Sequence, residues 1–271
     1  MATAALALPV LAGLAYLNVF GAPARYIAVN GASLLLALIW IIALPQGTLP
    51  VAARRVLIAV LLALLFAPLA TGPSLGGISR WLPLGPFTLH AGMLAVPLLA
   101  VLVADEEGYA PFVLSVALLA ALLQPDMATG AALMLAAVGL YDATRDWRYG
   151  LFAAVAFAAA LVAAVNGELP AQPFADRVIF LLARTDPLAA LGLLATLVAS
   201  CYLIVAAAPG PTTARKALAG CLFGFSFAGL MSNYPSALIA YGAAPILGFG
   251  LALGLLDRDR DGANAHSTRE N

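Results

Sequence analysis

The chain has 271 residues, of which 63% are hydrophobic and only 10% are charged. A mean hydropathy of +1.00 together with long apolar runs excludes an ordinary soluble globular domain and indicates a membrane protein. The formal net charge of zero argues against nucleic acid as a partner. Cys201 and Cys221 both lie inside apolar segments, so we expect buried thiols rather than a disulfide or a metal site.

Ten apolar segments follow one another along the chain, and each approaches the roughly 20 residues that a spanning helix needs. Backbone groups in lipid must be hydrogen-bonded within their own segment, so we expect helices, and the alternating pattern of barrel strands is missing. The sequence therefore predicts an all-α polytopic membrane protein with about ten transmembrane helices in a single domain, residues 1–256. The segments are 4–21, 27–45, 55–70, 89–104, 109–124, 129–143, 149–165, 187–208, 215–232 and 243–256.

The basic residues indicate the orientation, because cytoplasmic loops carry an excess of Arg and Lys. With the N-terminus inside, the nine basic residues on the cytoplasmic side are Arg54, Arg55, Arg145, Arg148, Arg215, Lys216, Arg258, Arg260 and Arg269. The four on the outer side are Arg25, Arg80, Arg177 and Arg184. We therefore predict that both termini are cytoplasmic, that 257–271 is a disordered cytoplasmic tail, and that the acidic run 105–107 is a solvated inner turn.

This orientation places the longer polar loops on the outer face, where loops usually carry binding and catalytic residues. These loops are 71–90, the turn around Asp126, 166–187 and 233–245. His90 ends the first of them, at the start of the fourth apolar segment. We interpret it as a polar structural contact rather than a catalyst.

Asp126 lies in the turn Gln124-Pro125-Asp126, between two apolar segments. An ionisable group at such a place is costly unless it faces water or a partner, which makes it a candidate functional residue. Two interpretations stay open. Asp126 is either the N-cap of the next helix at a water-exposed turn, or a general base that activates a hydroxyl nucleophile at the membrane surface.

Arg80 and Trp81 lie in a loop rich in glycine and proline. The pair is either an interfacial anchor at the lipid headgroups or part of a phosphate site, because a guanidinium matches phosphate oxygens with paired donors. Arg177 could bind the same anion or pair with Asp176. No Cys/His spacing indicates zinc, and no phosphate-binding nucleotide loop is present.

Three blocks of these loops resemble, in order, the SEDS family (shape, elongation, division and sporulation). Residues 77–87 are similar to its Gly-x-x-Arg-Trp loop, and 122–129 to its Gln-Pro-Asp-Leu-Gly-Thr block. Residues 240–244 are similar to its Ser-Tyr-Gly-Gly-Ser block. The resemblance spans most of the chain and implies a SEDS-like bundle of ten helices with both termini inside.

The resemblance implies a peptidoglycan glycosyltransferase in the bacterial inner (cytoplasmic) membrane, active in cell wall synthesis linked to cell shape or division. It implies a polyprenyl-diphosphate-linked disaccharide, lipid II, as the substrate at the outer face, and a single-pass transpeptidase or other envelope protein as partner. Asp126 would be the catalytic carboxylate, and Arg or a divalent cation such as Mg²⁺ would stabilise the leaving diphosphate. The candidate substrate-binding residues are Arg80, Trp81, Gln124, Thr129, Arg177, Tyr241 and Gly242.

The chain also departs from the family pattern. His90-Ala91-Gly92-Met93 stands where the family usually has Gln-Pro-Ser-Glu, so Met93 replaces a glutamate. The outer loop 166–187 is short for the family. These departures keep a second interpretation open, in which the protein is a catalytically silent SEDS-like scaffold or regulator of a cell-envelope complex. A polyprenyl transporter has less support, because no pair of broken helices occurs in two matching halves.

Overall fold

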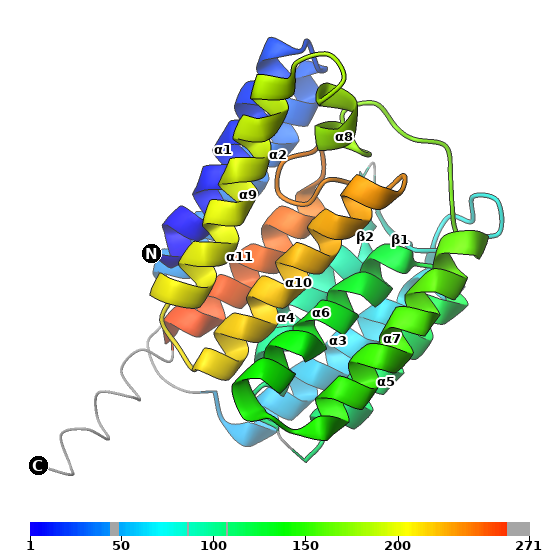
Figure 1. Ribbon diagram of the computed structural model, residues 1–271, viewed down its shortest axis with the longest axis vertical. Helices are drawn as coiled ribbons and strands as arrows, with labels where there is room; N and C mark the ends of the chain where they lie inside the picture. The colour runs from blue at the N-terminus through cyan, green and yellow to red at the C-terminus, as the bar shows by residue number, and fades with distance from the viewer. Residues whose placement is uncertain (44–48, 86, 107, 259–271) are drawn as a thin grey trace, which may run out of the picture.

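The computed structural model describes residues 1–43, 49–85, 87–106 and 108–258, with side chains up to residue 256. Within these residues the chain forms a bundle of helices and one β-hairpin (Figure 1). The long helices are α1 (Ala2–Val19), α2 (Ala24–Ala43), α3 (Val51–Thr71), α4 (Ala91–Val103), α5 (Ala110–Leu123), α6 (Met127–Thr144), α7 (Trp147–Asn166), α9 (Pro187–Ala207), α10 (Thr212–Met231) and α11 (Ala243–Arg258). The short elements are α8 (Val178–Leu182), β1 (Trp81–Leu84) and β2 (Phe87–His90).

Each of the ten predicted segments coincides with one long helix, with boundaries that differ by a few residues. Helices α1, α2, α3, α6, α7 and α9 are long and apolar enough to cross a membrane, and α4, α5 and α11 are apolar but shorter. The chain is therefore an all-α polytopic membrane protein, as predicted. The number of ten spans and the cytoplasmic placement of both termini stay predictions. Helix α11 extends to Arg258, and the rest of the predicted tail, 259–271, lies outside the described residues.

The predicted loop 71–90 contains the hairpin, which the sequence analysis did not foresee. Its register pairs Trp81 with His90 and Leu84 with Phe87. Gly85 at the turn has a φ of 59°, a left-handed conformation that glycine adopts without steric cost. The Ala91 N–H donates to the Arg80 carbonyl at 3.0 Å. The hairpin therefore holds Arg80 beside the first residue of α4.

The core of the bundle is built around α4, α6 and α10. Helix α6 packs along α10 and α7, and α11 packs against α2 and α4, while α1 and α9 lie side by side at the other edge (Figure 1). A Cβ atom added to Gly220 would overlap the carbonyl oxygen of Leu135, so α10 and α6 touch backbone to backbone. Such close approach is how helices associate within lipid. The start of α6 is thereby fixed relative to α4.

The acidic turn between α4 and α5 is not solvated at Glu106, so this prediction is wrong for that residue. The Glu106 side chain is only 7% exposed and lies 3.7 Å from Arg54 and 3.4 Å from Arg55. Asp105 lies 3.4 Å from Arg54, and burial raises the pKa of Asp105 against the opposing effect of Arg54. These ion pairs tie the start of α3 to the turn after α4. Glu107 lies outside the described residues.

Candidate functional site

Asp126 is the N-cap of α6 and is also almost completely buried. Its Oδ1 accepts the Thr129 backbone N–H at 3.2 Å, and its Oδ2 accepts the Thr129 hydroxyl at 2.6 Å. Only 1% of the residue is exposed, which contradicts the interpretation of a water-exposed turn. The capping role is present, and the carboxylate is held in one orientation. Cap and general base are therefore compatible roles for this residue.

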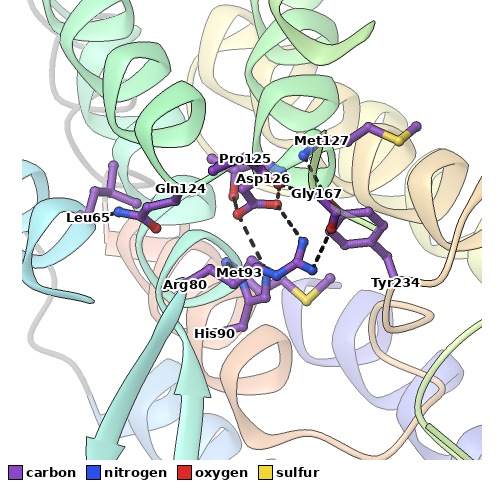
Figure 2. A network of polar contacts seen from close by, with 11 residues as sticks. Leu65, Arg80, His90, Met93, Gln124, Pro125, Asp126, Met127, Gly167 and Tyr234 are labelled. Carbon is purple, nitrogen blue, oxygen red and sulfur yellow. Dashed lines mark hydrogen bonds and ion pairs between the residues drawn. The ribbon is translucent and has the colours of Figure 1, made fainter. Parts of the chain in front are cut away.

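The guanidinium of Arg80 faces this carboxylate from the base of the hairpin (Figure 2). Its Nη1 lies 4.0 Å from Asp126 Oδ1, and its Nη2 donates to the Gly167 carbonyl at 3.0 Å. The guanidinium lies over the rings of Trp81 at 5.0 Å and Tyr234 at 4.5 Å. Arg80 is 2% exposed, so it is a buried counter-ion rather than a headgroup anchor. Its Nε and Nη1 have no hydrogen-bond partner among the described residues.

His90 approaches the same carboxylate from the start of α4. Its Nδ1 accepts the Met93 backbone N–H at 3.2 Å, and its Nε2 lies 3.4 Å from Asp126 Oδ2 (Figure 2). Burial lowers the pKa of His90, which Asp126 opposes and Arg80 reinforces. The imidazole is therefore neutral at neutral pH. The structural contact that the sequence led us to expect for His90 is its cap on α4. The sequence did not predict the contact with Asp126, because that contact depends on the register of the hairpin.

Tyr234, in the loop after α10, completes the cluster. Its hydroxyl accepts the Met127 backbone N–H at 3.0 Å, and its ring covers Arg80. Burial raises the pKa of Tyr234 to about 12, and the nearby Asp126 carboxylate adds to the shift. The phenol is therefore neutral. The sequence placed Tyr234 in an outer loop but gave no sign of these contacts.

A cavity of about 370 Å³ opens beside this cluster. Its polar lining includes Arg80, His90, Asp176 and Tyr241, while α2, the hairpin and α11 supply apolar walls. Burial raises the pKa of Asp176, although its Oδ2 accepts the Gln172 N–H at 2.8 Å. Asp126 is not among the lining residues, whereas Arg80 and His90, which both contact Asp126, are.

The other predicted site residues fall into separate groups. Trp81, Tyr241 and Gly242 line the cavity together with Arg80. The Tyr241 ring stacks on Tyr26 at 3.7 Å, and the Gly242 N–H donates to the side-chain oxygen of Asn30 at 3.0 Å. This buried asparagine therefore fixes the Tyr-Gly loop against α2.

Gln124 and Thr129 surround Asp126 rather than the cavity. Gln124 is 3% exposed and donates its side-chain amide to the Leu65 carbonyl, which joins the end of α5 to α3. Arg177 is not among the lining residues: its N–H donates to the Tyr234 carbonyl at 3.1 Å, and its guanidinium lies over the Phe180 ring at 4.0 Å. Its role in binding an anion stays a prediction.

The donor set does not suit a protein-held cation. Within the described part of the chain, no three His, Cys, Asp or Glu side chains lie close enough together to hold a metal ion. Asp126 already accepts from Thr129 and faces the positive charge of Arg80. Arg80 is therefore the group in this site that can meet an anionic leaving group.

Comparisons with known proteins support the fold. No protein-family model matches the sequence, and no curated protein matches it. An aspartate-to-alanine variant of the Thermus thermophilus rod shape determining protein RodA aligns with a TM-score of 0.72 and 20% identity, covering 94% of this chain and 96% of that one. The unsubstituted RodA gives a TM-score of 0.71 and 20% identity, covering 94% and 95%.

A third solved structure comes from a peptidoglycan synthase complex described as coordinating polymerization and crosslinking. It aligns with a TM-score of 0.62 and 22% identity, covering 94% of this chain and 97% of that one. At identities this low the likeness establishes the fold alone, and each alignment covers nearly the whole of both chains. The chain therefore has the fold of the rod shape determining protein RodA, which is the SEDS bundle that its motif blocks predict.

Proposed function

We propose that the protein is a membrane glycosyltransferase that polymerises a polyprenyl-diphosphate-linked disaccharide, lipid II, at the outer face of the bacterial inner membrane. One observation carries the proposal. A buried, oriented carboxylate, Asp126, lies beside a buried guanidinium, Arg80, and Arg80 lines a cavity with apolar sides. In the RodA fold this arrangement supports a role in peptidoglycan synthesis, linked to cell shape or division.

The chemistry needs a base and a cation, and the site offers both. The acceptor hydroxyl oxygen attacks the anomeric carbon of the donor sugar, and the bond from that carbon to the diphosphate oxygen breaks. The electron pair leaves with the diphosphate, and the hydroxyl proton passes to Asp126. The Nε and Nη1 donors of Arg80, which have no hydrogen-bond partner in the described part of the chain, suit the diphosphate oxygens.

The proposal requires one movement. Arg80 lies between Asp126 and the cavity, so the guanidinium must swing toward a bound diphosphate before a hydroxyl can reach the carboxylate. Catalytic contacts often tighten only in the substrate complex. This movement would have to break or stretch the hydrogen bond from Arg80 to the Gly167 carbonyl and would lengthen its contact with Asp126.

A second candidate function is a silent scaffold or regulator of a cell-envelope complex. The specific observation in its favour is that Asp126 is closed off from the cavity and that Met93 occupies the position of the family's glutamate. The third structural relative belongs to a peptidoglycan synthase complex. Under either function we therefore propose an envelope partner such as a single-pass transpeptidase.

The deciding experiment incubates purified protein in liposomes with labelled lipid-linked disaccharide, with and without Mg²⁺, and resolves glycan chains on a gel. Asp126→Asn keeps an N-cap residue of equal quality but removes the base. Asp142→Asn is the matched control, since it makes the same change at the exposed far end of the same helix. Polymer from the wild type and the control, but not from Asp126→Asn, is the expected result.

Two other outcomes are informative. Polymer from Asp126→Asn would remove Asp126 from the mechanism. No polymer from any form, with saturable binding of the lipid-linked disaccharide, would favour the scaffold.

A further inference from the structure

We propose that His90 is the positioning residue for Asp126, holding the carboxylate from the α4 side through its Nε2–H. The inference rests on the proposed function and names a residue that the family pattern does not supply. The N-caps of two helices face each other here, since His90 caps α4, Asp126 caps α6, and their side chains are 3.4 Å apart.

The cap of α4 decides which imidazole nitrogen carries the proton. The Met93 N–H donates to His90 Nδ1 at 3.2 Å, so Nδ1 must present a lone pair. In a neutral imidazole the proton is then on Nε2. Nε2 has no hydrogen-bond partner among the described residues, and Asp126 Oδ2 lies 3.4 Å away. A short movement of either side chain would make this contact a hydrogen bond to the carboxylate.

The surrounding residues are shaped for this contact. Thr129 holds Asp126 from the α6 side through its N–H and hydroxyl, which leaves the α4 side to His90. A Cβ atom at Gly92 would overlap the Thr129 hydroxyl and lie 3.3 Å from Asp126 Oδ2. Only glycine at this position lets the start of α4 come so near the carboxylate.

The departure from the SEDS pattern therefore has a local explanation. Within His90-Ala91-Gly92-Met93, the histidine faces Asp126, the glycine gives it room, and the Met93 N–H fixes the imidazole. Two of the four changed positions, His90 and Gly92, thus build one arrangement around the carboxylate, and the backbone N–H of the fourth completes it. A chain that had only lost its glutamate would need neither the histidine nor the glycine.

Protonation of His90 would undo the arrangement. A second proton on Nδ1 would face the Met93 N–H, and the cap of α4 would be lost. The charged groups that face the imidazole are Asp126 on α6 and Arg80 before β1, and the pKa of His90 is lowered by burial and Arg80 against the effect of Asp126. Activity should therefore have an acid limb below the ordinary histidine pKa of about 6.5.

Nitrogen NMR tests the pairing without any need for activity. The chain has two histidines, and the other one, His266, lies outside the described residues and can be removed by His266→Ala. In ¹⁵N-histidine-labelled protein in nanodiscs, we expect the Nε2–H tautomer at pH 7. Asp126→Asn should lower the pKa of His90, and Asp142→Asn should not. An Nδ1–H tautomer, or a pKa insensitive to Asp126→Asn, would overturn the proposal.

Two substitutions test the positioning role. His90→Gln places an amide near the Nε2 position and so keeps a donor toward Asp126. His90→Asn places an amide near the Nδ1 position and so keeps the acceptor that caps α4. His90→Asn should lose about tenfold in kcat with little change in KM, since it loses one hydrogen bond to a charged group. His90→Gln should keep the larger part of kcat and lose the acid limb.

Equal losses in the two variants, at equal stability, would reduce His90 to a structural cap. The failure of the proposed function would look different, because the wild type itself would then make no polymer. In that case the positioning role would be refuted together with the proposed function. A measured dependence of the His90 pKa on Asp126 would still show that the two side chains interact.

Discussion

Replacing Arg80 with methionine should strongly destabilise the protein, because Asp126 would keep a buried negative charge without a cation. At the observed 4.0 Å, opposite unit charges attract by about 4 kcal/mol at an effective dielectric constant of about 20. Removal of one partner from a buried pair typically costs about 3–5 kcal/mol. The lost hydrogen bond to Gly167 adds about 1 kcal/mol, while the methionine keeps the contact with the two rings. We expect a total near 5 kcal/mol, within a range of about 4–6 kcal/mol.

Reversible unfolding by SDS in mixed micelles measures this loss. A second variant combines Arg80→Met with Asp126→Asn and should be more stable than the sum of the two single changes implies, by about 1–3 kcal/mol. Arg145→Met is the control, because Arg145 is 71% exposed beside Asp142, and its loss should cost less than about 1 kcal/mol. A cost below about 1 kcal/mol for Arg80→Met, or strict additivity, would refute the buried ion pair.

Three further predictions concern the same cluster. Gly92→Ala should cost about 1–3 kcal/mol through overlap with Thr129, whereas Gly192→Ala, with open space around it, should be neutral or slightly stabilising in the same unfolding assay. Tyr234→Phe should cost about 1 kcal/mol, since the Met127 N–H loses its acceptor; an unchanged midpoint would contradict this. Because burial lowers the pKa of His90, the unfolded chain binds this proton more readily, so the wild type should lose stability relative to His90→Gln as pH falls below about 6.5. If the unfolding free energies of the wild type and His90→Gln changed with pH in parallel, the lowered pKa of His90 would be refuted.

The helices were predictable because each one is a long apolar run, and burial in lipid forces such a run to be helical. Helix α8 was not, since five residues are too short to show a period. The hairpin was missed because Pro83 and the turn around Gly85 interrupt its strands, and such residues indicate a loop. Tertiary packing against α3 and α11, rather than local propensity, makes these residues a hairpin.

The site was predictable in its residue types but not in its geometry. Asp126 and Arg80 were identified from their neighbours in sequence, yet their contact depends on the hairpin register and on the position of α6. The acceptor for Arg80 is the carbonyl of Gly167, and a backbone group leaves no signal in a sequence. The contact of His90 with Asp126 was missed for a related reason. The role of a lone histidine depends on which group its second ring nitrogen faces, and the sequence does not show that group.

The hairpin also limits how deep the reacting groups can lie below the membrane surface. With two strands only, each strand has one edge that pairs with no other strand, and hydrocarbon cannot satisfy those amides and carbonyls. Where they face away from the bundle, the edges must meet water or headgroups. A strand of four residues spans roughly 13 Å, so with the turn of the hairpin at the membrane surface Arg80 and His90, at its base, would lie within that distance of water. Under the proposed function, the hydrocarbon tail of a lipid-linked sugar would therefore stay in the bilayer while its head group reaches the site.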